Sequence, residues 1–303
     1  MNAKPFLKWA GGKNQILYEL ESRIPLEIRK SGIIDRYVEP FVGGGAFFFL
    51  IKNKYEIKQT FLIDINKELI LAYKTIKKNP LELIQKLKDL EESFFRLSNK
   101  AKKGLFYEIR RLYNNHIKIF DYDNFNDDWI ERSAFLIFLN KTCFNGLFRQ
   151  NRKGEFNVPY GDYKNPKICD AENIIEVSNA LKYSEIINGD FEISEKFIEK
   201  GTFVYFDPPY RPLNKTSAFT RYSKEDFNDE DQKRLAIFYR QMSDRGAYLM
   251  LSNSDPKNQN PDDNFFDELY KDFNIDRVLA NRMINCNGDK RGKIKEIVIT
   301  NYK

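Results

Sequence analysis

Histidine and cysteine are scarce in this chain of 303 residues, which has one histidine and three cysteines. His116 alone cannot build a His-based catalytic triad or a site in which several histidines hold a metal ion. Cys143, Cys169 and Cys286 are scattered and form no C-x-x-C pair. Neither a disulfide framework nor a zinc site is therefore expected, and a reducing compartment is favoured.

Long hydrophobic runs are also missing. The longest apolar stretch, residues 41–51, contains three glycines and is too short to span a bilayer. Lys8 and Lys13 interrupt the apolar residues near the N-terminus, which does not have the pattern of a signal peptide. We therefore expect a cytoplasmic protein with no membrane partner and no bound metal.

Basic and aromatic residues are present in excess, and their placement is informative. Lys and Arg number 50 against 44 Asp and Glu, a net charge of +6. Residues 141–167 hold six basic and two acidic residues, interleaved with five aromatic ones. This mixture is typical of a surface that binds nucleic acid. An ordinary solvated loop is the alternative.

Strand and helix signals alternate at both ends of the chain. Apolar runs predict strands at 37–41, 61–64, 185–188, 203–207, 247–252 and 294–301. Helical spacing predicts helices at 67–78, 80–95, 104–116 and 129–140. The alternation indicates an α/β fold with a mostly parallel sheet, and it fails between about 70 and 184, where helices dominate.

The most informative segment is residues 203–210, an apolar run followed by Asp-Pro-Pro-Tyr. Pro208 and Pro209 have no backbone N–H, and Pro208 disfavours a helical conformation at Asp207. The carboxylate of Asp207 and the neighbouring carbonyls are therefore acceptors beside the flat ring of Tyr210. Such a corner suits a planar amine, for example the exocyclic amino group of a nucleobase. The alternative is a common strand end.

A glycine turn follows the strand at 37–41. A strand that runs into Gly43 and Gly45 at a helix start is typical of nucleotide sites in doubly wound folds. Phe48 replaces the third glycine of the dinucleotide pattern, which favours a ligand without phosphates, such as S-adenosylmethionine. Asp64, at the end of the next strand, can accept both ribose hydroxyls or, alternatively, cap a helix.

Two weaker segments complete the set. Asp190 and Phe191 follow another strand and offer a second acid and an aromatic ring that could hold adenine. Residues 8–13, Lys-Trp-Ala-Gly-Gly-Lys, combine small residues with a flat ring and two cations. Their glycines allow a close approach to a ligand, although Gly-Gly is often only a turn.

In this order along the chain, the segments resemble the Dam-type DNA adenine-N6 methyltransferases. The resemblance is carried by residues 6–13, 37–45, 144–149, 154–161, 207–210 and 217–222, and it extends to 285–288 and 293–299. It implies a Rossmann-like methyltransferase sheet of seven strands, the last one antiparallel. It also implies a catalytic domain of residues 1–69 and 167–303 and an inserted, mainly helical target-recognition domain of residues 70–166.

Residue roles follow from the resemblance together with the patterns above. The expected catalytic residues are Asp207, Pro208, Pro209 and Tyr210. The expected cofactor-binding residues are Trp9, Ala10, Gly11, Gly12, Lys13, Glu39, Pro40, Phe41, Gly43, Gly45, Asp64, Asp190, Phe191 and Asp207. The expected DNA-binding residues are Lys8, Phe144, Asn145, Gly146, Leu147, Arg149, Arg152, Asn157, Pro159 and Tyr163.

The predicted activity is transfer of a methyl group from S-adenosylmethionine to N6 of a flipped adenine in duplex DNA. In the family, this recognition-loop pattern goes with the sequence GATC, and a restriction endonuclease that cuts the same site is a candidate partner. Phe144 stands where some members have tyrosine, so a hydroxyl contact to phosphate is not expected. The alternatives are a catalytically silent DNA-binding module and an enzyme acting on amino groups of RNA or protein.

Overall fold

The computed structural model describes residues 2–9, 13, 15–115, 117, 120–151, 153–211, 227–281 and 293–303. The predictions for Ala10, Gly11, Gly12 and Arg152 lie outside these residues, as do His116 and the segments 217–222 and 285–288. Seven strands of the described residues form one sheet in the order β3-β2-β1-β4-β5-β7-β6. Their bounds are β1 Ile33–Glu39, β2 Glu56–Asp64, β3 Ser184–Asn188, β4 Phe203–Phe206, β5 Tyr248–Ser254, β6 Asn274–Asn281 and β7 Lys293–Thr300.

The strand directions confirm the predicted methyltransferase-like sheet. The pairs β1–β2, β1–β4, β2–β3 and β4–β5 are parallel. The last strand, β7, runs antiparallel to both of its neighbours, with Leu251 opposite Ile299 and Val278 opposite Glu296. Sequence patterns missed one strand, β6, because it is an edge strand with charged residues at Asp276 and Arg277, and Val278 and Ala280 are the buried residues among those whose side chains the structure describes.

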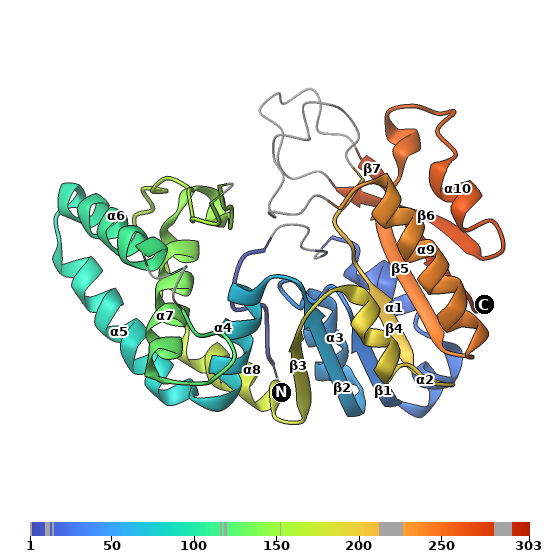
Figure 1. The fold of residues 1–303 in the computed structure, drawn as a ribbon, viewed down its shortest axis with the longest axis horizontal. Helices are drawn as coiled ribbons and strands as arrows, with labels where there is room; N and C mark the ends of the chain where they lie inside the picture. The colour runs from blue at the N-terminus through green and yellow to red at the C-terminus, as the bar shows by residue number, and fades with distance from the viewer. Residues whose placement is uncertain are drawn as a thin grey trace.

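Helices cover both faces of the sheet (Figure 1), and the alternation of side chains along β4 divides the core between them. Phe203 and Tyr205 belong to the core on one face, and Val204 and Phe206 to the core on the other. The first core is covered by α1 Leu17–Ser22, α3 Ala46–Lys54, α4 Lys67–Lys78 and α8 Ala171–Leu181. The second core is covered by η2 Phe191–Phe197, α9 Asp229–Asp244 and α10 Phe265–Leu269.

The chain between β2 and β3 is mainly helical. It contains α4, α5 Pro80–Arg96, α6 Asn99–Asn115, α7 Asp127–Thr142 and α8, and α5–α7 form a lobe beside the sheet (Figure 1). Helix α4 packs on β2 and β3 as well as on α7, so the predicted boundary at residue 70 falls inside a helix shared by the sheet and the lobe. The division into residues 1–69 with 167–303 and residues 70–166 stays a prediction. No helix in the described ranges has the length and apolar character needed to cross a membrane.

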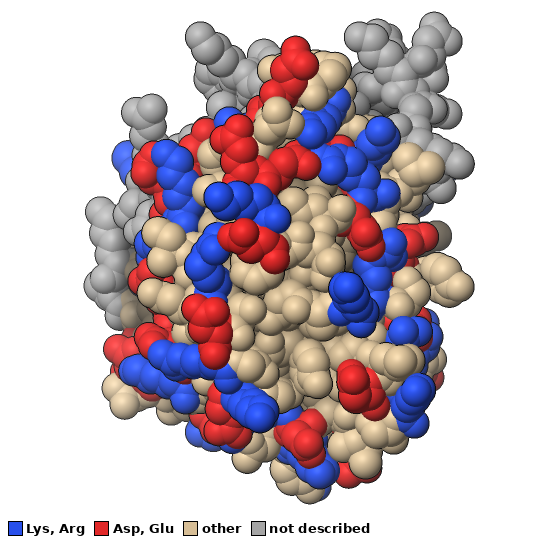
Figure 2. Space-filling view, turned by 90° about the vertical axis from the view of Figure 1, so that its right-hand side faces the viewer, with Lys and Arg blue, Asp and Glu red and all other residues tan. Residues whose placement is uncertain are grey.

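The outer face that contains α9, α10 and β6 carries both signs of charge (Figure 2). Lysines and arginines alternate there with acids around an uncharged centre. Several of them are paired: Arg240 with Asp272 at 2.6 Å, and Arg277 with Asp267 at 2.7 Å. This face therefore does not present a basic patch.

A buried ion pair joins α4 to α7. Arg132 donates from Nε to Glu68 Oε2 at 2.8 Å, and both side chains are under 5% exposed. Tyr122 donates a further hydrogen bond to the same carboxylate, and Arg132 donates to the carbonyl of Tyr113. Because Glu68 follows the end of β2 closely and α7 leads into residues 141–167, this pair fixes the lobe against the sheet.

Loss of one partner of this pair should destabilise the protein strongly. We expect Arg132→Met to lower the free energy of unfolding by about 3–5 kcal/mol, because it leaves the Glu68 carboxylate buried and unpaired. Lys86 and Glu131 form an exposed pair between α5 and α7 at 3.0 Å, so Lys86→Met is the matched control, with a loss of at most about 1 kcal/mol. Urea unfolding followed by circular dichroism measures both, and equal small losses would contradict the structural role.

Candidate active site

Three acidic residues lie at the same edge of the sheet. The order β2-β1-β4 places the carboxyl ends of three parallel strands side by side, and Asp64, Glu39 and Asp207 stand at those ends. Glu39 is 2% exposed and accepts a hydrogen bond from Tyr37 Oη at 2.6 Å. Burial, with the nearby charges of Asp207 and Asp64, raises the pKa of Glu39 well above its usual value. The predicted acids are therefore brought together.

Asp207 is held at the strand end by a lysine. Its Oδ1 lies 2.7 Å from Nζ of Lys13 and accepts a longer hydrogen bond of 3.4 Å from Ser252. Burial raises the pKa of Asp207 to about 6, although Lys13 acts in the opposite direction. The carboxylate is therefore ionised at neutral pH and accepts N–H donors.

The ring of Tyr210 lies beside the same ammonium group. Nζ of Lys13 is 3.7 Å from the ring centroid and also contacts the phenol oxygen. Tyr210 Oη donates to Oε2 of Glu296 on β7, and that carboxylate lies 3.8 Å from Lys13. Lys13 thus sits between two carboxylates and an aromatic face.

Glu296 was missed by sequence reasoning. A signal for it exists, since it is the one acid of a strand that is otherwise apolar, basic or Thr. The other acids were predicted because each follows the carboxyl end of a parallel strand. Strand β7 is antiparallel, so this pattern does not identify Glu296.

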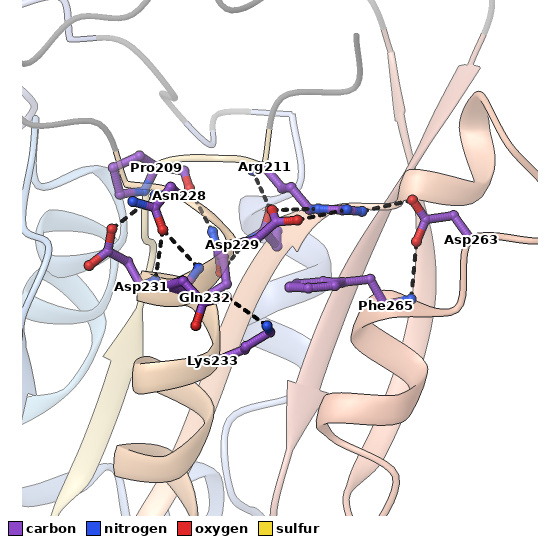
Figure 3. A network of polar contacts seen from close by, with 11 residues as sticks. Pro209, Arg211, Asn228, Asp229, Asp231, Gln232, Lys233, Asp263 and Phe265 are labelled. Carbon is purple, nitrogen blue, oxygen red and sulfur yellow. Dashed lines mark hydrogen bonds and ion pairs between the residues drawn. The ribbon is translucent and has the colours of Figure 1, made fainter. Parts of the chain in front are cut away.

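The turn after Asp207 is fixed from α9 and β5 (Figure 3). Gln232 of α9 donates to the carbonyl of Pro209 at 3.1 Å, and Asn253 of β5 accepts from the backbone N–H of Arg211 at 3.4 Å. The Arg211 guanidinium bonds to Asp229 at 2.8 Å and to Asp263 at 2.7 Å, and it lies over the ring of Phe265. These partners come from distant parts of the chain, and sequence reasoning named none of them.

The predicted glycine turn has backbone conformations that favour glycine. Gly43 has φ +48° and Gly45 has φ +69°. A Cβ on Gly45 would lie 2.6 Å from the hydroxyl of Tyr73, which donates to the carbonyl of Gly43 at 3.1 Å. The absent Cβ of Gly45 therefore lets the turn pack tightly on Tyr73, and Gly43, which is half-buried, is the glycine of the two that can approach a ligand. Pro40 and Phe41, which are also predicted to bind the cofactor, lie between β1 and this glycine turn.

Asp64 is bonded to this turn. Its Oδ2 accepts from the N–H of Gly43 at 2.9 Å, and its Oδ1 accepts from the N–H of Asn66 at 2.8 Å. Burial raises the pKa of Asp64 to about 6 against these two bonds. Helix α4 is capped by Asn66, which accepts from the N–H of Leu69, so the alternative that Asp64 is the cap is wrong.

Asp190 and Phe191 follow the carboxyl end of β3, at the same edge of the sheet as Asp64. Their roles in cofactor binding stay predictions. Asp190 accepts two hydrogen bonds from Arg234, at 3.1 and 2.9 Å. Phe191 is 1% exposed and stacks on the more exposed ring of Phe41, with centroids 5.5 Å apart. Sequence reasoning missed Arg234, which lies over Phe191.

The predicted DNA-binding residues that the structure describes between Phe144 and Tyr163 lie in one folded loop next to α6 and α7 (Figure 1), whereas Lys8 belongs to the N-terminal segment. Backbone bonds from Phe144 to Pro159 and from Asn157 to Arg149 close it like a hairpin. Nε of Arg149 donates to Oδ1 of Asn157 at 2.8 Å. The exposed fractions of Phe144 and Tyr163 are 52% and 39%. Asn145 has φ +57°, and Gly146 is a buried residue of the loop.

Trp9 connects this loop to the acidic edge. Its ring stacks on Phe148 with centroids 4.9 Å apart and planes 19° apart. A Cβ on Gly43 would lie 3.2 Å from Cδ1 of the same indole. One side chain therefore contacts both the glycine turn and the loop, so the two predicted binding regions are neighbours in space.

Comparison with known proteins finds relatives along nearly the whole chain. The family model of D12 class N6 adenine-specific DNA methyltransferases matches residues 9–284. The chain is 53% identical to the type II methyltransferase M.MjaIII of Methanocaldococcus jannaschii, with 100% of both chains covered. It is 39% identical to the type II methyltransferase M1.LlaDCHI of Lactococcus lactis subsp. cremoris, over 100% of this chain and 96% of that one. It is 31% identical to the DNA adenine methylase of Escherichia coli K12, over 97% and 94%.

These relatives confirm the resemblance found in the sequence and favour DNA over RNA or protein as the acceptor. The acidic corner, the seven-stranded sheet with its antiparallel last strand and the match over residues 9–284 agree with one another. The chain belongs to the D12 class of N6 adenine-specific DNA methyltransferases.

Proposed function

We propose that this enzyme transfers the methyl group of S-adenosylmethionine to N6 of an adenine flipped out of duplex DNA, within the sequence GATC. The observation that carries the proposal is the corner formed by Asp207 and Tyr210. Its carboxylate already accepts an N–H donor from Lys13, directly beside an aromatic ring. An exocyclic amine on a flat base would meet the same acceptor and the same kind of platform.

The glycine turn and Asp64 fit S-adenosylmethionine. Gly43 is half-buried and leaves backbone accessible, whereas Gly45 is buried against Tyr73, and the carboxylate of Asp64 offers acceptors to ribose hydroxyls. Phe48, which replaces the third glycine of the dinucleotide pattern, is fully buried in the core and leaves no phosphate cradle there. The bound cofactor supplies an activated methyl group on a sulfonium, so the protein needs no nucleophile of its own.

The residues of the corner would activate the adenine amine. Its lone pair is delocalised into the ring, so N6 is a poor nucleophile. We infer that Asp207 and the carbonyl of Pro208 each accept one N6–H and thereby localise the lone pair. Asp207 is ionised at neutral pH and can act as an acceptor. The amino proton becomes acidic only after methyl transfer, so no strong base is required, and positioning supplies much of the rate.

Flipping an adenine costs a few kcal/mol, and stacking on an aromatic ring recovers about 1–3 kcal/mol. Tyr210 is the platform, and its ring is held by the bond from its hydroxyl to Glu296. Lys13 occupies this corner in the present structure, so an entering amine would share or displace its ammonium group.

Specificity for GATC is proposed from the recognition-loop resemblance at residues 144–149. Arg149 bonds to the neutral amide of Asn157 and keeps its charge available for a base edge. The names of the relatives from M. jannaschii and L. lactis, both type II methyltransferases, support a restriction endonuclease as a partner acting on the same site.

Loss of the Asp207 carboxylate should remove nearly all methyl transfer. We expect Asp207→Ala to slow transfer of a labelled methyl group to a GATC duplex by about 10²–10³-fold, because one of the two acceptors that stabilise the charge developing on N6 is removed. DNA affinity, measured by fluorescence anisotropy, should change little. A duplex in which the adenines of both strands of the palindromic site are replaced by purine, which has no amino group, should accept no label from the wild-type enzyme. Undiminished turnover by Asp207→Ala would refute the assigned role.

Cofactor affinity should fall in mild acid. The pKa of Asp64 is raised to about 6, so lowering the pH through 6 protonates the carboxyl and removes acceptors for the ribose. We expect affinity for S-adenosylmethionine, measured by titration calorimetry, to fall by up to about tenfold per pH unit below this value. Asp64→Asn should bind weakly with a flatter pH profile. An unchanged pH dependence in Asp64→Asn would assign the titration to another group, and Asp207→Asn is the variant to compare.

Arg149 should discriminate one base pair. An arginine that bonds O6 and N7 of guanine contributes about 1–3 kcal/mol against the wrong base. We therefore expect Arg149→Ala to lower the ratio of kcat/KM for GATC over a duplex substituted at one position. Lys164, an exposed residue of the same region, is the control, since Lys164→Ala should weaken binding to every sequence equally. Equal losses on all duplexes with Arg149→Ala would make it a phosphate contact.

A further inference from the structure

Asn140, near the end of α7, uses its whole amide group between two segments that are far apart in the sequence. It is 1% exposed. Its Oδ1 accepts from the N–H of Lys8 at 2.9 Å. Its Nδ2 donates to the carbonyl of Lys8 at 2.9 Å and to the carbonyl of Gly146 at 3.0 Å. A reversed amide would face two carbonyls with its oxygen, so these three bonds also fix its orientation.

These bonds fix the point from which the Lys8 side chain leaves the backbone. The stem of Lys8 lies against Gly146: a Cβ on this glycine would come within 2.7 Å of Cδ of Lys8. Gly146 has φ +63°, a conformation that favours glycine. Lys8 itself is exposed, so its ammonium is presented to solvent beside the recognition loop.

The next residue reinforces the same contact. Trp9 stacks on Phe148, which belongs to the same loop as Gly146 and is 2% exposed. The backbone of Lys8, the ring of Trp9 and the loop are therefore connected by buried bonds and packing rather than by exposed contacts. A lysine is flexible, and a fixed origin for its stem reduces the freedom lost when it meets DNA.

We propose that Asn140 is a positioning residue for base discrimination, which it controls by holding Lys8 in register with the recognition loop. The proposal rests on the proposed function, because it concerns the DNA sequence that the enzyme selects. Asn140 is buried and bonded on all sides, so it acts on DNA through Lys8 and Gly146 and not by its own contact. Small displacements of a positioned group can cost large factors in rate, so loss of the amide should show in selectivity.

The chain offers a matched control in Asn114 of α6. Its amide also clamps the recognition loop, by accepting from the N–H of Phe156 at 2.8 Å and donating to the carbonyl of Phe156 at 3.0 Å. These two bonds do not involve Lys8. Asn114→Ala and Asn140→Ala therefore both loosen the loop, but only the second releases Lys8.

The test measures kcat/KM of the full-length enzyme on a GATC duplex and on duplexes with one base pair changed, for the wild type and both variants. Thermal midpoints and S-adenosylmethionine affinity are measured in parallel. Because a lysine can bond O6 and N7 of guanine, we expect Lys8→Met to relax discrimination at one base pair, and Asn140→Ala to lose about tenfold in discrimination at the same base pair. The double variant Lys8→Met/Asn140→Ala should show no further loss, because both changes remove the same contact with DNA. Asn114→Ala should keep the discrimination ratio even where its thermal midpoint falls as far.

A second variant keeps the test informative where Asn140→Ala folds poorly. Gly146→Ala keeps the Asn140 amide, but its Cβ would come within 2.7 Å of Cδ of Lys8 at a φ of +63°, so it should relax the same base pair by moving the Lys8 stem and the loop apart. An equal fall in kcat/KM on every duplex, or multiplicative losses in the double variant, would overturn the role of Asn140. Wild-type enzyme that methylates no DNA would instead refute the proposed function, whereas selective wild type with unchanged variants would refute this inference alone.

Discussion

The candidate active site depends on how three carboxyl groups, one buried and two half-buried, are stabilised where parallel strands of the sheet end. Glu39, Asp64 and Asp207 stand at the ends of adjacent strands, and burial raises the pKa of each. Each is stabilised differently: by a phenol, by two backbone N–H groups and by the ammonium of Lys13. The ammonium group of Lys13 thus stabilises the ionised carboxylate of Asp207. An incoming amine requires such a carboxylate as a hydrogen-bond acceptor.

Buried contacts connect this edge of the sheet to the recognition loop. The buried pair Glu68–Arg132 holds α7 against α4, and α7 then leads directly into the loop. Trp9 packs between the loop and the glycine turn, and Asn140 bonds the backbone of Lys8 to the loop. Selection of a base and presentation of a methyl donor would therefore take place on parts of one packed unit, not on separate domains joined by a linker.

Much of the fold and the main motifs could be predicted from the sequence, because local signals specify them. The strand ending at Asp207, the glycine turn and the helix at 67–78 are read from apolar periodicity and turn residues, and they appear at the expected places. The edge strand β6, Arg234 and Asn140 could not be found this way, and Glu296 was overlooked although it is the one acid of its strand. Their importance arises from partners far away in the chain, and isolated acids, arginines or asparagines carry no local pattern that identifies such partners.

The most direct test of the account is to map modified bases in DNA from cells that express the wild-type chain or Asp207→Ala. The account predicts N6-methyladenine in the wild-type sample at one short motif, GATC, and none above background with Asp207→Ala. Methylation that persists in the variant, or that falls on the amino group of cytosine, would contradict the claim that this acidic corner grips the amine of an everted adenine.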